Sequence, residues 1–364
     1  MEKRKIAVLI PAHNEEKVIG STLLSLLPLL PLEDVYVVDD GSEDQTSEIA
    51  RKMTPNVLTL SPNVGKATAM NKAITEFNLT SRYSYIMPLD ADTHITSDFL
   101  FKMIPVLERD TKKEIACVVG KVVGRKNGWV TQYRIWEYEV SQTIHKEAQG
   151  IEGAILVCPG CATIFRSSVF EKIKIPTGTL TEDMDFTFLL HRKRLGKIVF
   201  HPEGYVITQD PRTLADFIKQ IQRWYVGFWQ CVLKHHVPWG GQMLDVEVAL
   251  LALEGLFNGL LMIFFIVLLP FAIKYHPQVL LAPFFFDVTF FLVPTMLLTL
   301  VRQKTWSILF FIPHFYLLRF ISSVMFLLSF MKVVLGIDLR MKWGKAKRYA
   351  ISKEELYVPT ISSH

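Results

Sequence analysis

The chain has 364 residues, with 40 Lys and Arg against 35 Asp and Glu, and a formal net charge of +5. This small excess does not indicate nucleic-acid binding, and no RNA-binding or helix-turn-helix signature accompanies it. Only eight of the charged residues fall between Val246 and Leu335. That distribution excludes a wholly soluble protein, because about 20 consecutive apolar residues are enough to cross a bilayer.

The first part of the chain alternates strand and helix patterns. Short apolar runs at Lys5–Ile10, Asp34–Asp39 and Asn56–Leu60 predict buried strands. Helical spacing of apolar residues over Glu15–Leu30, and a second helix over Asp44–Met53, separate them. This order predicts an α/β fold with a doubly wound sheet.

Polar clusters follow the predicted strands. His13-Asn14-Glu15 follows the first strand, Asp39-Asp40-Gly41-Ser42 ends the second, and Asp90-Ala91-Asp92 ends an apolar strand that starts at Tyr85. In open α/β sheets, ligands bind at these carboxyl ends. No GxGxxG follows the first strand and the chain has no GxxxxGK[ST], so the phosphate-binding loops of Rossmann dehydrogenases and P-loop NTPases are absent.

Asp90 and Asp92 stand two residues apart, which places both carboxylates on the same side of the strand end. Hard oxygen ligands of this kind suit Mg²⁺ or Mn²⁺, which keep open positions for phosphate oxygens. The alternative is a turn or cap, where aspartates are common.

Three further motifs have both a functional and a structural interpretation. Asn63–Lys66 places a glycine and a lysine before a helix start, which favours phosphate binding, or is a turn with a solvated lysine. Thr181–Asp183 precedes an apolar helix over Met184–Leu190 and is otherwise an N-cap with acidic first-turn residues. Gln220–Trp224 lies in Thr213–Lys234, whose mixture of aromatic and basic residues predicts an interfacial amphipathic helix.

The cysteines do not indicate a disulfide framework in a chain of this size. Cys158 and Cys161 have the spacing of a metal or redox pair, but no second CxxC or HxxxH accompanies them. The residues alone favour structural thiols at both positions.

Taken in order, the motifs DDGS, NVGK, DAD, TED and QxxRW resemble those of membrane-bound family 2 glycosyltransferases, the group of the hyaluronan, chitin, cellulose and poly-N-acetylglucosamine synthases. The resemblance runs from about Ile6 to Arg348. It implies a GT-A nucleotide-diphospho-sugar transferase domain with a Rossmann-like mixed sheet, and inverting transfer to an acceptor hydroxyl.

The resemblance also implies roles for individual residues. Asp183 would be the general base, and Asp92, with Asp90 nearby, would hold Mg²⁺ or Mn²⁺. The nucleotide and donor sugar would contact Pro11, His13, Asn14, Glu15, Asp40, Lys66, Asp90, Gln220 and Arg223. The acceptor would contact Gly160, Cys161, Arg166, Glu182 and Trp224.

The function expected from the resemblance is transfer from a UDP-sugar, with UDP-N-acetylglucosamine the first choice, to a growing glycan at the membrane. One alternative is transfer of a single sugar to polyprenyl phosphate or another lipid acceptor. A second is a non-enzymatic membrane protein that senses a nucleotide-sugar. The expected partners are the donor, a glycan or lipid-linked acceptor and membrane lipid, without nucleic acid, while homo-oligomerisation stays open.

The expected organisation has four parts. A catalytic domain over 1–211 precedes an interfacial segment over 212–244, a membrane region over 245–335 and a basic tail over 336–364. The membrane region contains about three spans, at roughly 250–273, 278–301 and 305–331.

The expected location is the cell membrane, with several crossings. The apolar run before Pro11 has only five residues, too few for a signal-peptide core, so we expect a cytoplasmic catalytic domain. The basic residues of the tail (Arg340, Lys342, Lys345, Lys347 and Arg348) favour a cytoplasmic tail too. Three crossings would place it outside, so either one segment is re-entrant or interfacial, or the charge rule fails here.

Overall fold

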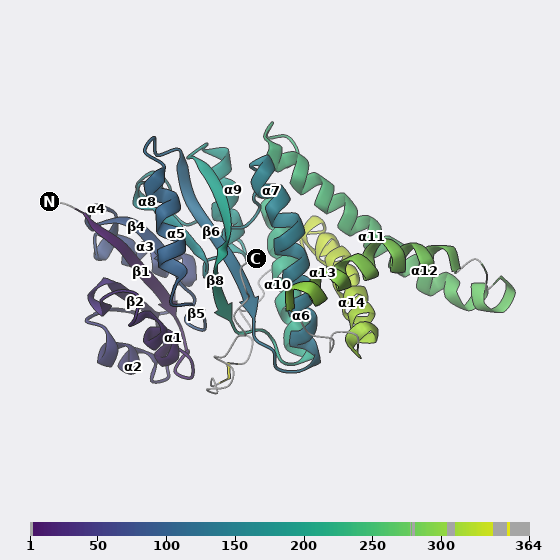
Figure 1. The fold of residues 1–364 in the computed structure, drawn as a ribbon, viewed down its shortest axis with the longest axis horizontal. Coiled ribbons are helices and arrows are strands. Elements are labelled where there is room, and N and C mark those ends of the chain that lie inside the picture. Colours follow the sequence, from purple (N-terminus) through teal and green to yellow (C-terminus); the bar gives the residue numbers. More distant parts are fainter. Residues whose placement is uncertain (1–2, 277, 279–280, 304–309, 338–347, 350–364) are drawn as a thin grey trace.

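A computed structural model of the chain describes residues 3–276, 278, 281–303, 310–337 and 348–349. A layered α/β domain occupies one end of the molecule, and a group of long helices extends from its other side (Figure 1). The amino-terminal strand lies in the part of the α/β domain farthest from those helices.

One eight-stranded sheet forms the middle layer, in the order β3-β2-β1-β4-β7-β6-β8-β5. Its strands are β1 (Arg4–Ala12), β2 (Val35–Asp40), β3 (Asn56–Leu60), β4 (Tyr83–Pro88), β5 (His94–Ile95), β6 (Ile115–Gly124), β7 (Thr163–Arg166) and β8 (Lys197–Thr208). The first four strands in space run parallel, as expected for a doubly wound start. β7 pairs antiparallel with both β4 and β6, which makes the sheet mixed.

Helices cover both faces of this sheet. One face carries α1 (Ile19–Leu26), α2 (Thr46–Met53) and α5 (Phe99–Arg109), and the other carries α3 (Lys66–Glu76), α4 (Leu79–Arg82), α8 (Ser167–Lys172) and α9 (Glu182–Arg192). The predicted helix over Glu15–Leu30 is shorter than expected, because Asn14 adopts a left-handed φ of 54° and residues 15–18 form a turn.

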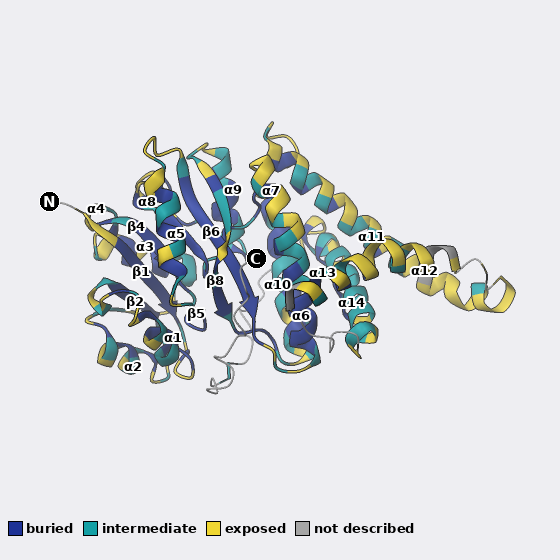
Figure 2. Cartoon of the chain, in the orientation of Figure 1, coloured by how far each residue is buried: buried dark blue, intermediate teal, exposed yellow. Residues whose placement is uncertain are grey.

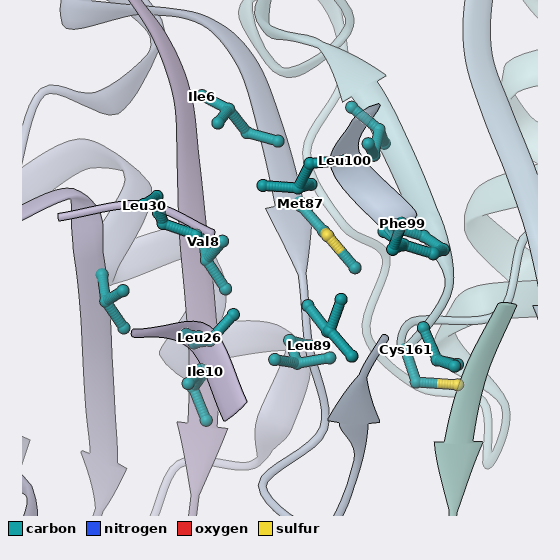
Figure 3. Packing of buried hydrophobic residues seen from close by; sticks show 14 of the residues in the cluster. Ile6, Val8, Ile10, Leu26, Leu30, Met87, Leu89, Phe99, Leu100 and Cys161 are labelled. Carbon is teal, nitrogen blue, oxygen red and sulfur yellow. The ribbon is translucent and has the colours of Figure 1, made fainter. Parts of the chain in front are cut away.

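Alternate side chains of β1 point to opposite faces of the sheet, so the sheet has one hydrophobic cluster on each face. Val8 and Ile10 point to the cluster that contains α1 and α5, whereas Ala7 and Leu9 point to the cluster that contains α3. Figure 3 shows the first cluster, with Leu89 and Cys161 close to the end of β4. Burial on both faces explains why these strands are continuous apolar runs.

A helical insertion between β6 and β7 was not predicted from the sequence. It comprises α6 (Trp129–Val140), a π-helical turn (Ser141–Lys146) and α7 (Glu147–Glu152). Its buried face includes the polar side chains of Gln132, Arg134 and Glu139, so an apolar periodicity search misses it. The insertion packs against the last helices of the chain and joins the sheet domain to them.

The remaining helices are α10 (Leu214–Lys234), α11 (Met243–Tyr275), α12 (Leu281–Asp287), a π-helical segment (Val288–Leu292), α13 (Val293–Gln303) and α14 (Ile312–Val334). A short 3₁₀ turn, Leu32–Asp34, precedes β2. Most of the segment expected to be interfacial, 212–244, forms α10, which packs along α14, and the segment ends at the start of α11.

The described residues contain three segments long and apolar enough to span a membrane: Met243–Phe264, Phe284–Val301 and Ile312–Val334. They lie close to the expected spans, although the first begins earlier, and residues 279–280 and 305–309 of the expected spans lie outside the described residues. Apolar side chains of α11 and α12 are exposed along their length (Figure 2), as expected of a lipid-facing surface.

Candidate active site

The loops that follow β1 and β2 are tied together at the carboxyl end of the sheet. The side chain of Ser42 accepts a hydrogen bond from the Asn14 amide at 2.9 Å, and Asn14 Oδ1 accepts one from the Glu43 amide at 2.8 Å. Pro11 lies within β1, opposite Val38 of β2. Pro11 and Asn14, which the resemblance assigned to the nucleotide and donor sugar, therefore lie at the same edge of the sheet as Ser42.

Asp40 organises the next loop. Its two carboxylate oxygens accept the backbone amides of Val64 and Gly65, each at 2.8 Å. Gly65 has a φ of +86°, which favours glycine, and it leads directly into α3 at Lys66. The resemblance placed Asp40 among the residues that contact the nucleotide and donor sugar; in this structure its carboxylate fixes the loop that presents Lys66.

The Lys66 ammonium joins two other motifs. Its Nζ lies 2.7 Å from Asp90 Oδ1 and 2.7 Å from Glu182 Oε1. Burial alone would lower the pKa of Lys66, but the attraction of the two carboxylates outweighs it and the pKa lies well above its usual value. A Cβ added at Gly160 would lie 3.5 Å from the same Nζ, so the backbone of the predicted acceptor segment also approaches this point.

The surroundings of Asp183 favour the protonated form of its carboxyl group more than is usual for an aspartate. It lies in the first turn of α9, where one carboxylate oxygen accepts the Met184 amide at 2.8 Å. Burial, together with repulsion from Glu182, raises the pKa of Asp183 to about 6, although Lys66 and Arg223 oppose the rise. A carboxyl group of this kind can accept a proton near neutral pH.

Helix α10 brings the QxxRW motif to the same place. The Leu180 amide donates to Gln230 Oε1 at 2.9 Å, and a Cβ at Gly227 would collide with Thr181. The helix therefore packs directly against the TED turn, and Arg223 affects the charge state of both Asp90 and Asp183.

The Trp224 ring is oriented by a buried arginine. The guanidinium of Arg134 lies 4.6 Å from the centre of the indole ring, and it also forms an ion pair with Glu137. Arg134 was not identified from the sequence, because nothing in its local pattern distinguishes it from an exposed helical arginine.

Asp92 and Glu15 both contact the guanidinium of Arg348, a residue near the carboxyl-terminal end of the sequence. Arg348 forms an ion pair with Asp92, and its Nε lies 2.9 Å from Glu15 Oε2. Both carboxylates are buried. Sequence patterns placed Arg348 only in a generally basic tail, whose residues 338–347 and 350–364 lie outside the described residues.

The donor set fits a divalent cation that completes its coordination with ligands from outside the protein. In the described part of the chain no three His, Cys, Asp or Glu side chains form a ready metal site. Mg²⁺ and Mn²⁺ commonly bind through one or two carboxylates plus substrate phosphates. A guanidinium already sits on Asp92, which shows that this buried carboxylate recruits positive charge.

Two buried polar atoms near the motifs have no hydrogen-bond partner within the described residues, His13 Nδ1 and Gln220 Oε1. Buried polar groups are normally satisfied, so atoms of this kind are suited to a bound ligand. Both belong to residues that the sequence assigned to the donor.

The structure separates the two cysteines of the CxxC pair. Cys158 Sγ lies 3.7 Å from Cys117 Sγ, and all four cysteines are free and buried. Cys161 instead lies among the site carboxylates, where burial and then Asp90 and Asp92 raise its thiol pKa well above the usual value. A thiol held protonated is a poor metal ligand or nucleophile, which agrees with a structural thiol.

Arg166 is not brought to the site. It ends β7 opposite Tyr85, and its guanidinium donates to the carbonyls of Leu107 and Ile115, each at 2.7 Å, with Asp110 nearby. The strand runs antiparallel to β4, so Arg166 lies away from the carboxyl end that carries Asp90. In this structure it anchors the end of α5 and does not face an acceptor.

Comparisons with known proteins identify a matching family model and similar sequences. Residues 7–174 match the family model of glycosyl transferase family 2. Poly-beta-1,6-N-acetyl-D-glucosamine synthases from Staphylococcus epidermidis and Staphylococcus aureus are 30% and 29% identical to this chain over 240 residues, which are 64% of the chain and 57% of each relative. The chain thus spans less than two thirds of the length of these curated relatives.

A mannosyltransferase from Pyrobaculum calidifontis, solved in complex with GDP-Man and Mn²⁺, superposes with a TM-score of 0.56 at 14% identity. The match covers 93% of this chain and 89% of that one, so the likeness in fold extends into the helices beyond the sheet. The GT-A fold expected from the motifs is confirmed. Residues 7–174 therefore match glycosyl transferase family 2 and belong to a domain with a GT-A fold.

Proposed function

We propose that this protein transfers a sugar from UDP-N-acetylglucosamine to the hydroxyl of a growing glycan at a membrane surface, with inversion at the anomeric carbon. The observation that carries the proposal is the meeting of Lys66, Asp90, Glu182 and Asp183 in one cluster, with a base of pKa about 6 beside two cations. The choice of donor and polymer follows the synthases that the chain resembles in sequence.

In the proposed reaction, Asp183 accepts the proton of the attacking hydroxyl as the oxygen bonds to the anomeric carbon. The bond from that carbon to the diphosphate breaks on the opposite face, and UDP leaves with the electron pair. Lys66 and Arg223 stabilise the negative charge that develops on the leaving diphosphate. One displacement inverts the centre, so no covalent intermediate on the protein is needed.

We also propose that Asp92, with Asp90 nearby, holds Mg²⁺ or Mn²⁺. Bound there, the ion would supply Lewis-acid stabilisation of the diphosphate. The protein alone is net negative where a diphosphate must bind, because the cluster has five carboxylates and three cationic side chains. The carboxylates are those of Glu15, Asp90, Asp92, Glu182 and Asp183, and the cations are Lys66, Arg223 and Arg348. A divalent cation carried with the donor resolves this repulsion.

The acceptor is proposed to approach along α10. This helix carries Trp224 at the site and contacts α14, one of the candidate membrane spans. A glycan held at this junction would present its terminal hydroxyl to Asp183 while staying close to the bilayer surface. The catalytic domain is proposed to face the cytoplasm, where nucleotide-sugars are made.

The test is incubation of the purified full chain in lipid nanodiscs with a panel of UDP-sugars, a short N-acetylglucosamine acceptor and Mn²⁺. We expect UDP release with UDP-N-acetylglucosamine and a ladder of products extended one residue at a time. A single sugar attached to polyprenyl phosphate, with no ladder, would replace the polymerising function by lipid glycosylation. Binding of the donor without any turnover would leave only a nucleotide-sugar sensor.

A further inference from the structure

Two described residues of the tail, Arg348 and Tyr349, contact the sheet domain, and Arg348 does so at the active site. Arg348 contacts both oxygens of Glu15, at distances from 2.9 to 3.2 Å, and forms an ion pair with Asp92. Glu15 follows β1 and Asp92 follows β4, so one guanidinium bridges two strand ends of the sheet. Charge-assisted contacts of this kind are among the stronger hydrogen bonds in proteins.

Tyr349 is fixed by a separate set of contacts. Gln209 Nε2 donates to the Tyr349 carbonyl at 2.9 Å, and its Oε1 accepts the Tyr349 amide at 3.2 Å. The Arg212 guanidinium lies 4.3 Å from the centre of the tyrosine ring. Gln209 and Arg212 lie between β8 and α10, so the tail is attached just ahead of the helix that carries QxxRW.

The position of the guanidinium coincides with that of the proposed metal ion. Asp92 is the carboxylate proposed to hold the cation, and Arg348 forms an ion pair with that same carboxylate. A carboxylate that binds a guanidinium and a divalent ion through the same oxygens cannot hold both at full strength. Asp90 is paired with Lys66, so Asp92 and Glu15 are the carboxylates whose charge Arg348 balances.

We propose that Arg348 is a built-in competitor of the divalent cation, and that the Arg348–Tyr349 strap leaves Asp92 when the metal binds together with the donor diphosphate. This inference rests on the metal site proposed above. Before the donor binds, the Arg348 guanidinium balances the negative charge of the buried carboxylates, and the two hydrogen bonds between Gln209 and the Tyr349 backbone hold the strap in place. The incoming ion replaces the guanidinium on Asp92, and the released Arg348 remains within reach of the negatively charged donor.

The first measurement is Mn²⁺ binding by calorimetry to the full-length protein in nanodiscs, without nucleotide. Arg348→Ala should bind Mn²⁺ at least about tenfold more tightly than wild type, because the ion no longer displaces a charge-assisted hydrogen bond. Gln209→Ala should shift the affinity in the same direction by a smaller factor. Arg51→Ala is the matched control: it removes the same charge from an exposed side chain on α2 and should change the affinity less than about twofold.

A second measurement uses the unchanged protein, so a folding defect in a variant cannot explain it. Trypsin must take the Arg348 side chain into its own acidic pocket, and that side chain is engaged with Asp92 and Glu15. We expect cleavage after Arg348, followed by mass spectrometry, to be slow without ligand and several-fold faster with Mn²⁺ and UDP.

The outcomes separate this inference from the metal assignment. Equal or weaker Mn²⁺ binding by Arg348→Ala, with tight binding by wild type, would overturn the strap and leave the metal site intact. Absence of Mn²⁺ binding in both proteins, with or without UDP, would overturn the metal site and the strap together. Unchanged cleavage after Arg348 on addition of Mn²⁺ and UDP would show that the strap is not displaced.

Discussion

At the scale of single residues, the site depends on how each carboxylate is paired. Asp90 is 2.7 Å from Lys66, and although burial alone would raise the pKa of Asp90, that lysine holds it below the usual value. Asp183 instead accepts the Met184 amide, and burial together with repulsion from Glu182 raises its pKa to about 6. Two acidic groups of one cluster thereby differ in proton affinity, which is the usual basis for dividing roles between them.

The raised pKa of Asp183 gives a prediction for pH. The base must be deprotonated to accept a proton, so kcat/KM should fall about tenfold per pH unit below pH 6 and level off above it. Donor binding measured over the same range is the control, since Asp90, whose pKa is low, stays charged there. A profile that is flat from pH 5 to 7.5, at constant donor binding, would be incompatible with Asp183 as the base.

At the scale of elements, the close contact between α9 and α10 positions the site. Gly227 allows α10 to touch Thr181, the residue before the first turn that carries Asp183. Gly227→Ala should lower stability by about 1–3 kcal/mol through overpacking, and it should reduce turnover because α10 or the TED turn must move. Both effects are measurable as a thermal shift in nanodiscs and a rate of UDP release.

Gly20→Ala on α1 is a matched control for that substitution. Its added Cβ would lie 3.5 Å from the nearest side chain, which is ordinary van der Waals contact. Neither stability nor turnover should decrease in this variant. A Gly227→Ala protein that behaves like Gly20→Ala would show that the contact does not position the base.

The helices and strands of the structure also reveal which features sequence patterns can predict and which they cannot. The run at Asp34–Asp39 predicts β2 to within a residue, because a strand buried on both faces needs continuous apolar side chains. The run at Asn56–Leu60 predicts β3, although this strand lies at the edge of the sheet and is only partly buried. The motif residues Asp90 and Glu182 both lie within ion-pair distance of Lys66, and the order of the motifs alone predicts that all three lie at the same edge of the sheet. Arg134 and Arg348 could not be predicted, since each acts through contacts between segments far apart in the chain.

At the scale of the whole molecule, the contact between Arg348 and Asp92 constrains the membrane topology. The tail follows α14, the third candidate span, yet it returns to the catalytic site. We therefore expect an even number of complete crossings, with one apolar segment that is re-entrant or interfacial. This agrees with the positive-inside tendency of the basic tail.

Topology can be measured with epitope tags placed before Met1 and after His364 in intact cells or sealed vesicles. Both tags should be accessible from the same side and protected from the other. A carboxyl-terminal tag exposed on the opposite side would mean three complete crossings, and it would also rule out the contact between the tail and the catalytic site.

The central claim is that the cluster around Lys66 is a sugar-transfer site in which Asp183 is the base. The measurement that tests it most directly compares UDP binding and UDP release for wild type and Asp183→Asn, with UDP-N-acetylglucosamine and Mn²⁺. Binding should stay within about threefold of wild type while turnover falls by 10² to 10⁴, the range that a positioned base contributes. Turnover retained at wild-type level by Asp183→Asn would contradict the account.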